Sequence, residues 1–98
     1  LAAGMKLLIE NKDVWRQLKS DPERYMKTFV EEVVRLESPV QSLMRFCARD
    51  TEIGGMPVPA GALINVRFAA ANRDERFFEC PEKIDLERPK AGAHMGFG

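Results

Sequence analysis

A glutamate and an arginine three positions apart, Glu32 and Arg35, are the first residues of this 98-residue chain whose spacing suggests a function. Residues at i and i+3 are neighbours on a helix, so the two side chains can pair along one face. On most amphipathic helices such a pair lies on the surface. Here the pair encloses Val33 and Val34 within an apolar stretch. We therefore predict a partly buried pair whose further partners come from elsewhere in the fold.

Arg45 is a second candidate, because it lies among the apolar residues of a strand-like run, between Met44 and Phe46. An arginine that is buried without partners is costly, so a buried Arg45 needs an anion or hydrogen-bond acceptors. The alternative is an edge strand whose arginine reaches water. The residues alone leave both interpretations open.

The cysteines and the histidine have too few neighbours of the right type to form a zinc site. Cys47 and Cys80 lie too far apart for a CxxC pattern, and His94 is the only histidine. A lone histidine, here three residues before Phe97 in a glycine-flanked loop, is usually structural. Cys80-Pro81 is a dipeptide found in haem-regulated sites, but a loop cysteine before proline is usually incidental. We expect free thiols in a reducing cytoplasm.

Composition excludes several classes of partner. Hydrophobic residues make up 45% and charged residues 31% of the chain, and fifteen basic residues balance fifteen acidic ones. No basic field favours nucleic acid, and no apolar run approaches the roughly 20 residues of a membrane span. Leu1 to Glu10 already reads as mid-helix and the chain stops in a glycine-rich loop, so we expect a fragment of a longer, soluble, cytoplasmic protein.

Residues 1–37 are predicted to form three helices, the last of which carries Glu32 and Arg35. Leu1 to Asn11 has apolar residues at helical spacing, and Asp13 can cap a short helix from Val14 to Lys19. Asp21 as N-cap and Pro22 at the first helical position predict a third helix from Pro22 to Glu37, which Ser38-Pro39 stops. Its expected apolar face consists of Tyr25, Met26, Phe29, Val30, Val33, Val34 and Leu36.

Residues 38–72 change to strand-like patterns with a short helical segment. Strands are predicted at 43–49, 51–53 and 56–58, with a turn at Gly54-Gly55. Residues 62–68 read as a buried strand after a second turn at 59–61, and 69–72 can turn helical. Residues 73–93 show no periodicity, and a loop this long in a compact domain suggests either a function or errors in the predicted elements. The predicted fold class is therefore mainly α with small β-sheets (α+β).

Read in order, these pieces resemble the C-terminal half of the cytochrome P-450 family, in the form typical of soluble bacterial members. The resemblance covers essentially all 98 residues, and its specificity lies in the ordered set rather than in any one motif. It implies a fragment of one domain. Residues 1–37 would form the end of a long helix, a short helix and helix K, and residues 38–72 strands and a short helix. Residues 73–98 would form the meander loop and the start of the haem-binding loop. The set comprises Glu32-Val33-Val34-Arg35, Ser38-Pro39-Val40, Arg45, Glu52-Ile53-Gly54-Gly55, Pro59-Ala60-Gly61, Ala70-Ala71-Asn72-Arg73-Asp74, Phe78, Pro81, Asp85, Arg88, His94 and Phe97-Gly98.

The resemblance assigns roles to the two candidates. Glu32 and Arg35 match the helix-K pair, which holds the haem-side core together. The third member of that network would be Lys83, which keeps a positive charge but lacks the planar, forked donors of arginine. Arg45 matches the arginine that binds a haem propionate.

Further roles follow from the same resemblance. Val40, Gln41 and Leu43 would line the substrate pocket, and Phe97 and Gly98 would open the haem-binding loop. The family pattern places the axial cysteine six residues after Gly98, and the oxygen-activating glycine and threonine before Leu1. No catalytic or metal-ligating residue is therefore expected within the 98 residues.

The implied parent is a monooxygenase with haem b. It would take two electrons from a ferredoxin-type partner and insert one atom of O2 into a small organic substrate. The chain alone is expected to be inactive and, because its apolar faces lack their partners, to self-associate. Two alternatives remain: a non-enzymatic fragment or degenerate paralogue with a structural or interaction role, and a haem-sensing module built on Cys80-Pro81.

Overall fold

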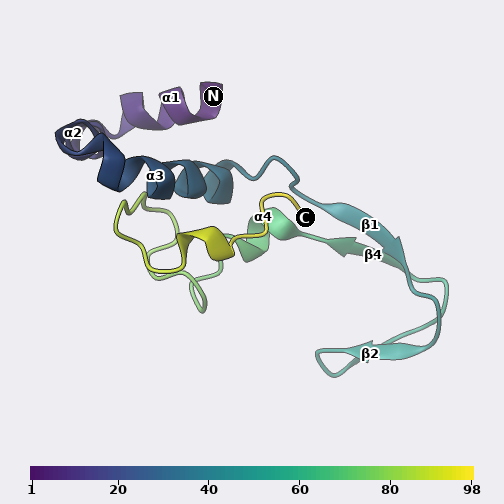
Figure 1. Cartoon of the computed structure of the whole chain (residues 1–98). Coiled ribbons are helices and arrows are strands. Elements are labelled where there is room, and N and C mark those ends of the chain that lie inside the picture. The colour runs from purple at the N-terminus through teal and green to yellow at the C-terminus, as the bar shows by residue number, and fades with distance from the viewer.

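A helical body and a projecting β-arm make up the structure, a computed structural model that describes all 98 residues (Figure 1). The molecule measures 54 × 25 × 20 Å, and its radius of gyration is 16.8 Å. A compact domain of this length would have a radius of gyration of about 13 Å. The arm accounts for the elongation. No helix is long and apolar enough to cross a membrane.

Helix α3 (Pro22–Glu37) has the predicted bounds. The Asp21 carboxylate accepts a hydrogen bond from the Arg24 amide at 3.3 Å, and Pro22 occupies the first turn. The helix ends at Ser38, whose amide donates to the Val34 carbonyl and whose φ of 23° turns the chain away. Local residue types are therefore sufficient to set both ends of this helix.

The two helices before it, α1 (Ala2–Glu10) and α2 (Lys12–Ser20), are separated by Asn11 alone. The prediction that Asp13 caps α2 is wrong. Asn11 holds the cap position, while Asp13 lies inside the first turn and pairs with Arg16 at 2.7 Å. An acidic residue in the first turn still favours the helix, because it faces the positive end of the helix dipole.

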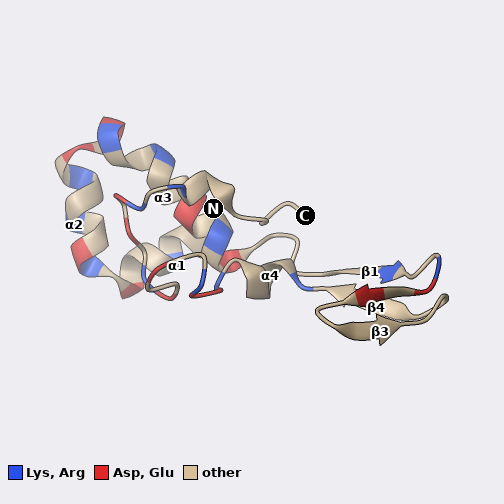
Figure 2. Cartoon of the chain, turned by 90° about the horizontal axis from the view of Figure 1, so that it is seen from below, with Lys and Arg blue, Asp and Glu red and all other residues tan.

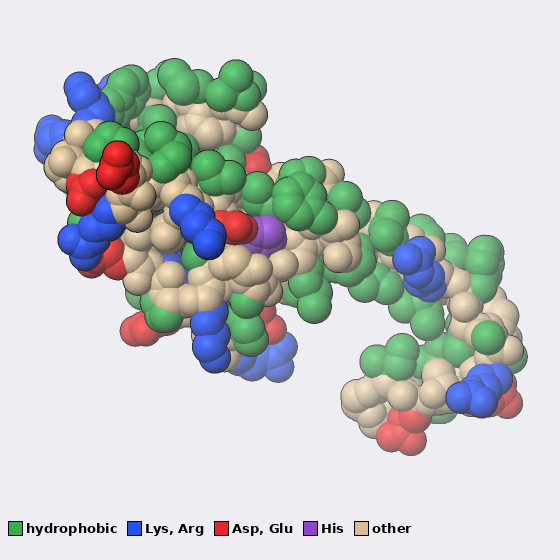
Figure 3. Space-filling view, viewed as in Figure 1, with side chains coloured by type: hydrophobic (Ala, Val, Ile, Leu, Met, Phe, Trp, Pro, Cys, Tyr) green, Lys and Arg blue, Asp and Glu red, His purple; other side chains and the backbone are tan.

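The core lies where the three helices meet the irregular segment after residue 73. Its buried members are Leu8, Leu18, Tyr25, Phe29 and Leu86. The apolar face predicted for α3 is only partly buried, because Met26 and Val30 are 46% and 50% exposed. These two residues line a shallow apolar hollow of about 290 Å³ between α1 and α3. Figure 3 shows hydrophobic side chains gathered over this side of the helical body and along the arm.

Two small antiparallel sheets form the arm. Strand β1 (Leu43–Phe46) pairs with β4 (Leu63–Val66), and β2 (Thr51–Ile53) pairs with β3 (Met56–Val58) through the predicted glycine turn. The first strand ends three residues earlier than predicted. Cys47 closes a turn there, exchanging backbone hydrogen bonds with Gly61 and Ala62.

The strand predicted at 62–68 is shorter and is not buried. It ends at Val66, and Phe68 already begins the short helix α4 (Phe68–Ala71). Leu63 is 57% exposed, because the two-stranded ribbon has no second layer over this residue. Residues 73–90 are irregular, as predicted, and are followed by a 3-10 turn at Ala91–Ala93.

Charges of both signs are interspersed over the helical body (Figure 2).

The isolated chain is expected to self-associate through the arm and the hollow beside α1, since exposed apolar surface drives association. Sedimentation velocity over a concentration series should show species larger than a monomer. A Phe46→Ser variant, which removes a 77% exposed ring, should shift the distribution towards the monomer, whereas Lys27→Ser on the exposed side of α3 should not. A monomer with a cooperative thermal transition would contradict this expectation.

Candidate functional site

Glu32 and Arg35 form a fully buried ion pair inside α3. Both side chains have an exposed fraction of 0%. Arg35 Nε donates to Glu32 Oε1 at 2.8 Å, and Nη2 donates to Oε2 at 3.0 Å, so the pair is bidentate. The predicted burial of this pair is confirmed, and it is complete rather than partial.

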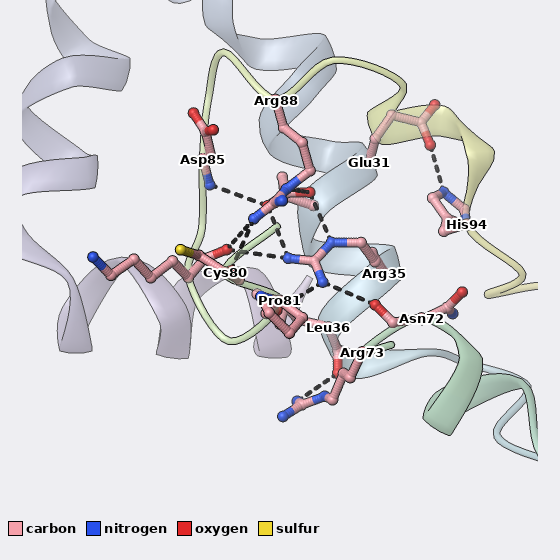
Figure 4. Close-up of polar contacts among 12 residues, drawn as sticks. Glu31, Arg35, Leu36, Asn72, Arg73, Cys80, Pro81, Asp85, Arg88 and His94 are labelled. Atoms are coloured by element: carbon pink, nitrogen blue, oxygen red, sulfur yellow. Dashed lines mark hydrogen bonds and ion pairs between the residues drawn. The ribbon is translucent and has the colours of Figure 1, made fainter. Parts of the chain in front are cut away.

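The remaining donors of Arg35 bind carbonyl groups from outside the helix (Figure 4). Nη1 donates to the carbonyls of Asn72 at 2.9 Å and Pro81 at 2.7 Å, and Nη2 donates to that of Lys83 at 3.1 Å. All five N–H groups of the guanidinium are thereby used. Its Cζ atom also lies over the Phe78 ring, 5.1 Å from the centroid. One side chain thus holds the irregular segment beneath α3.

The third charged member of this network is Arg88, and the prediction of Lys83 is wrong for the side chain. Arg88 Nε lies 3.1 Å from the Glu32 carboxylate, and its Nη atoms donate to the carbonyls of Glu79, Cys80 and Lys83. Lys83 is exposed and contributes only its carbonyl. A guanidinium group offers five donors in a fixed planar fork, whereas an ammonium group offers three.

Four hydrogen bonds converge on the Glu32 carboxylate, from Arg35, Arg88 and the Asp85 amide. Burial raises the pKa of Glu32, but the bonds from Arg35 and the Asp85 amide, the charge of Arg35 and the bond from Arg88 together lower it more. The net pKa of Glu32 therefore lies below its ordinary value of 4.5. The carboxylate is held ionised as the counter-charge of two guanidinium groups.

Acid should destabilise the fold through this carboxylate. Because the pKa of Glu32 is lower in the folded protein, the stability that it contributes is complete above the ordinary value of 4.5 and is lost as the pH falls through the lowered pKa. Urea denaturation at a series of pH values should show the free energy of unfolding falling below pH 4.5. Glu32→Gln should remove most of that slope. Glu23→Gln, at an exposed position in the first turn of the same helix, should remove little of it.

A second buried group ties the C-terminal end of α3 to the segment after α4. The Asn72 side chain donates to Ser38 Oγ at 2.8 Å, and Arg73 Nη2 donates to the Leu36 carbonyl at 2.8 Å. Asn72 and Ser38 are each 1% exposed. Arg88 and Asn72 stand in motifs quoted above without a predicted role, and Ser38 was predicted only to stop the helix. The bond from Asn72 to Ser38 spans 34 residues and that from Arg88 to Glu32 spans 56, so spacing could not identify them.

Three residues predicted for the substrate pocket and the haem loop meet at the base of the arm. The closest side-chain atoms to the position of a Cβ on Gly98 belong to Phe68, Val40 and Leu43, at 3.7 to 3.9 Å. Gly98 has a φ of 89°, which favours glycine. Gln41 is different: its side chain is exposed, and its carbonyl accepts the Ala69 amide.

Arg45 lies on the same face of β1 as Leu43, since alternate residues of a strand share a face. Its side chain reaches solvent, and its one hydrogen bond is to the neighbouring Met44 carbonyl at 3.2 Å. It makes no ion pair with the acidic residues of α3. Phe97 is 70% exposed, and its ring lies edge-on to that of His94, with the centroids 6.0 Å apart. The structure therefore brings Val40, Leu43 and Gly98 together and leaves Arg45 and Phe97 pointing outward.

Comparison with known proteins gives a consistent result. Residues 8–98 match the sequence profile of the family Cytochrome P450. The chain is 39% identical over 97 residues to the putative cytochrome P450 140 of Mycobacterium bovis, covering 99% of this chain and 22% of that protein. It is 37% identical over 95 residues to a steroid C26-monooxygenase of Rhodococcus jostii, covering 97% of this chain and 19% of that protein.

The fold is also similar to a solved structure. The substrate-free cytochrome P450 CYP150A6 of Mycobacterium marinum superposes with a TM-score of 0.91 at 37% identity, covering 99% of this chain and 24% of that one. The chain thus spans about a fifth to a quarter of the length of the proteins that it matches.

Proposed function

Since this chain belongs to the cytochrome P450 family, we propose that the protein containing this segment is a haem-thiolate monooxygenase. It takes two electrons from a ferredoxin-type donor and inserts one atom of O2 into a small organic substrate in the cytoplasm. The segment contributes the structural core on the haem side and part of the haem and substrate pockets. The thiolate ligand comes from outside the 98 residues, so the segment alone is inactive.

The observation that carries the proposal is the buried network of Glu32, Arg35 and Arg88. Glu32 and Arg35 join α3 to four main-chain groups of the segment after residue 71 and to the Arg88 side chain. Arg88 in turn donates to three carbonyls of its own segment. A long irregular segment held this rigidly has a defined shape without regular structure. Such a scaffold suits a cofactor pocket, which needs loops at fixed positions.

The base of the arm fits the edge of a haem. Leu43, Val40 and Gly98 present an apolar surface to a macrocycle, and Arg45, two residues along the same face, has donors available for a propionate. Phe97 and Gly98 would border the haem-binding loop. The thiolate ligand of a bound haem b would push electron density towards the iron, which favours O–O cleavage. The residues of this chain hold, orient and shield it.

The substrate side of the pocket is proposed to be partly apolar. Val40 and Leu43 offer aliphatic side chains, and Gln41 offers an amide beside them. The Rhodococcus relative is named for the oxidation of a steroid, which has a large apolar surface. We propose a small organic substrate with an apolar face for the present protein.

The test is the carbon monoxide spectrum of the reduced, haem-reconstituted protein. The full-length protein, meaning this segment together with the haem-binding cysteine, should give a thiolate-type Soret band, and the isolated 98-residue chain should not. Arg45→Leu should weaken haem retention in the full-length protein, whereas Arg49→Leu, elsewhere on the arm, should not. A thiolate-type band from the isolated chain that disappears in Cys80→Ala would instead favour haem sensing through Cys80.

A further inference from the structure

Residues 94–98 have no helix or strand, yet their backbone is held at almost every position. The Met95 amide donates to Asn72 Oδ1 at 2.6 Å, and the Gly96 carbonyl accepts from the Val40 amide at 2.9 Å. The Gly96 amide donates to His94 Nδ1 at 3.1 Å, and the Gly98 amide donates to the Met95 carbonyl at 3.1 Å. Two of these bonds are local turns, and the other two tie the segment to Val40 and Asn72, which are distant in sequence.

His94 joins this segment to α3. Its side chain is 5% exposed, and Nε2 lies 2.6 Å from Glu31 Oε2 (Figure 4). Because the Gly96 amide donates to Nδ1, that nitrogen carries no proton, and Nε2 must be the donor to Glu31. One imidazole thus orients two groups, a carboxylate of α3 and an amide of the segment.

Asn72 makes the second link. Its Oδ1 accepts the Met95 amide, its Nδ2 donates to Ser38 Oγ at 2.8 Å, and its carbonyl accepts from Arg35. Ser38 Oγ in turn donates to the Arg35 carbonyl at 2.9 Å. Asn72 therefore connects the segment to the buried Glu32–Arg35 network.

Gly96 shows how closely the segment approaches the helix. A Cβ at this position would lie 2.4 Å from Val34 Cγ1 and 2.9 Å from the Val34 carbonyl oxygen. No other residue fits without displacing backbone. The backbone of the segment thus packs directly against α3, and the space between them is too small even for a methyl group at position 96.

We propose that Glu31, Asn72 and His94 form a clasp that positions residues 94–98 against α3 and so sets where the haem-binding loop meets the iron. These are positioning residues, which touch neither haem nor substrate. The inference rests on the proposed function, because it assigns to the clasp the placing of the loop that begins at Phe97. Ligand loops act on a metal through the orientation of their donor atoms and of the amides that hydrogen-bond to those donors.

The clasp should therefore control the properties of the haem rather than only the stability of the fold. If residues 94–98 move, the loop amides that hydrogen-bond to the thiolate move with them, and both the reduction potential and the retention of the thiolate change. A purely structural role would lower the thermal midpoint but leave the spectrum of the folded, haem-loaded molecules unchanged.

The experiment uses the full-length haem protein and four variants, with His94→Gln as a fifth if His94→Leu loads no haem. His94→Leu removes both imidazole contacts, and Glu31→Leu removes one of them, while Glu31→Gln keeps an acceptor for Nε2. Leu18→Ala is the control. Leu18 is a core residue of α2 with an exposed fraction of 7%, and it does not touch the clasp. The carbon monoxide spectrum, the reduction potential, kcat and the thermal midpoint are measured for each.

We expect His94→Leu and Glu31→Leu to raise the fraction of haem without a thiolate-type band, to shift the potential and to lower kcat by about 10- to 100-fold. Glu31→Gln should restore values close to the wild type. Leu18→Ala should lower the thermal midpoint and change neither spectrum nor potential. If His94→Leu loads no haem, His94→Gln, which loses only the Gly96 contact, should show an intermediate change.

Two results would overturn the clasp. One is an unchanged spectrum and potential in the haem-loaded His94 and Glu31 variants. The other is an equal change in Leu18→Ala, which would mean that the haem responds to stability in general. Failure of the proposed function is distinct, since it would appear as a wild-type protein without a thiolate-type band.

Discussion

Replacing Glu32 by glutamine is expected to destabilise the folded protein by about 3–5 kcal/mol, the cost of leaving a buried charge without its partner. The amide retains the shape of the side chain but removes the counter-charge of Arg35 and Arg88, whose side chains are 0% and 5% exposed. It also turns one hydrogen-bond acceptor into a donor that faces guanidinium groups. Typical proteins have only about 5–15 kcal/mol of stability, so haem-loaded protein should be lost as well.

Urea denaturation and the yield of haem-loaded protein measure this effect. Glu23→Gln is the matched control, because Glu23 lies exposed in the first turn of the same helix. It should change the free energy of unfolding by no more than about 1 kcal/mol, the scale of a helix-dipole contribution. Equal effects of the two substitutions would show that the buried carboxylate has no special role.

The second large effect is expected from Arg35→Lys, a substitution that keeps the charge. Lysine has three donors, whereas Arg35 satisfies five acceptor contacts, so at least two of those contacts are lost. Each buried acceptor left unpaired costs about 1–3 kcal/mol. The contact of the guanidinium with the Phe78 ring is lost as well.

Two comparisons make this test specific. Arg16→Lys changes an exposed pair with Asp13 and should be nearly neutral. Lys83→Met removes an exposed ammonium whose residue enters the network only through its carbonyl, so it should stay within about 0.5 kcal/mol of the wild type. A large loss in Lys83→Met, with little change in Arg35→Lys, would restore Lys83 as the third charged member. Differential scanning calorimetry of the haem-loaded protein supplies the measurement.

Helix α3 and its ion pair were predictable because their causes are local. Asp21, Pro22 and Ser38-Pro39 act within one turn of the helix ends, and the spacing of Glu32 and Arg35 is a property of any helix. The irregular segment was predictable as well, because an absence of periodicity is also a local property. The family resemblance came from the same source, the order of short motifs along the chain.

Burial of the strands was not predictable in this way. Hydrophobic side chains indicate that a strand can be buried, but burial needs a second layer, and the arm of this chain has none. The pattern of Leu63–Val66 is therefore compatible with both a buried and an exposed ribbon. The choice depends on what packs against it, which is a property of the whole molecule.

The partners of the buried groups likewise depended on the fold. Arg88 and Lys83 are five residues apart in one irregular segment, and both carry the positive charge that Glu32 requires. Arg88 binds Glu32 across 56 residues, and His94 binds Glu31 across 63. Residue types along the chain thus specify that a buried carboxylate needs cations and that an arginine needs several acceptors. Which cation reaches the carboxylate is settled by the path of a loop without periodicity, because backbone geometry rather than residue type places its side chains.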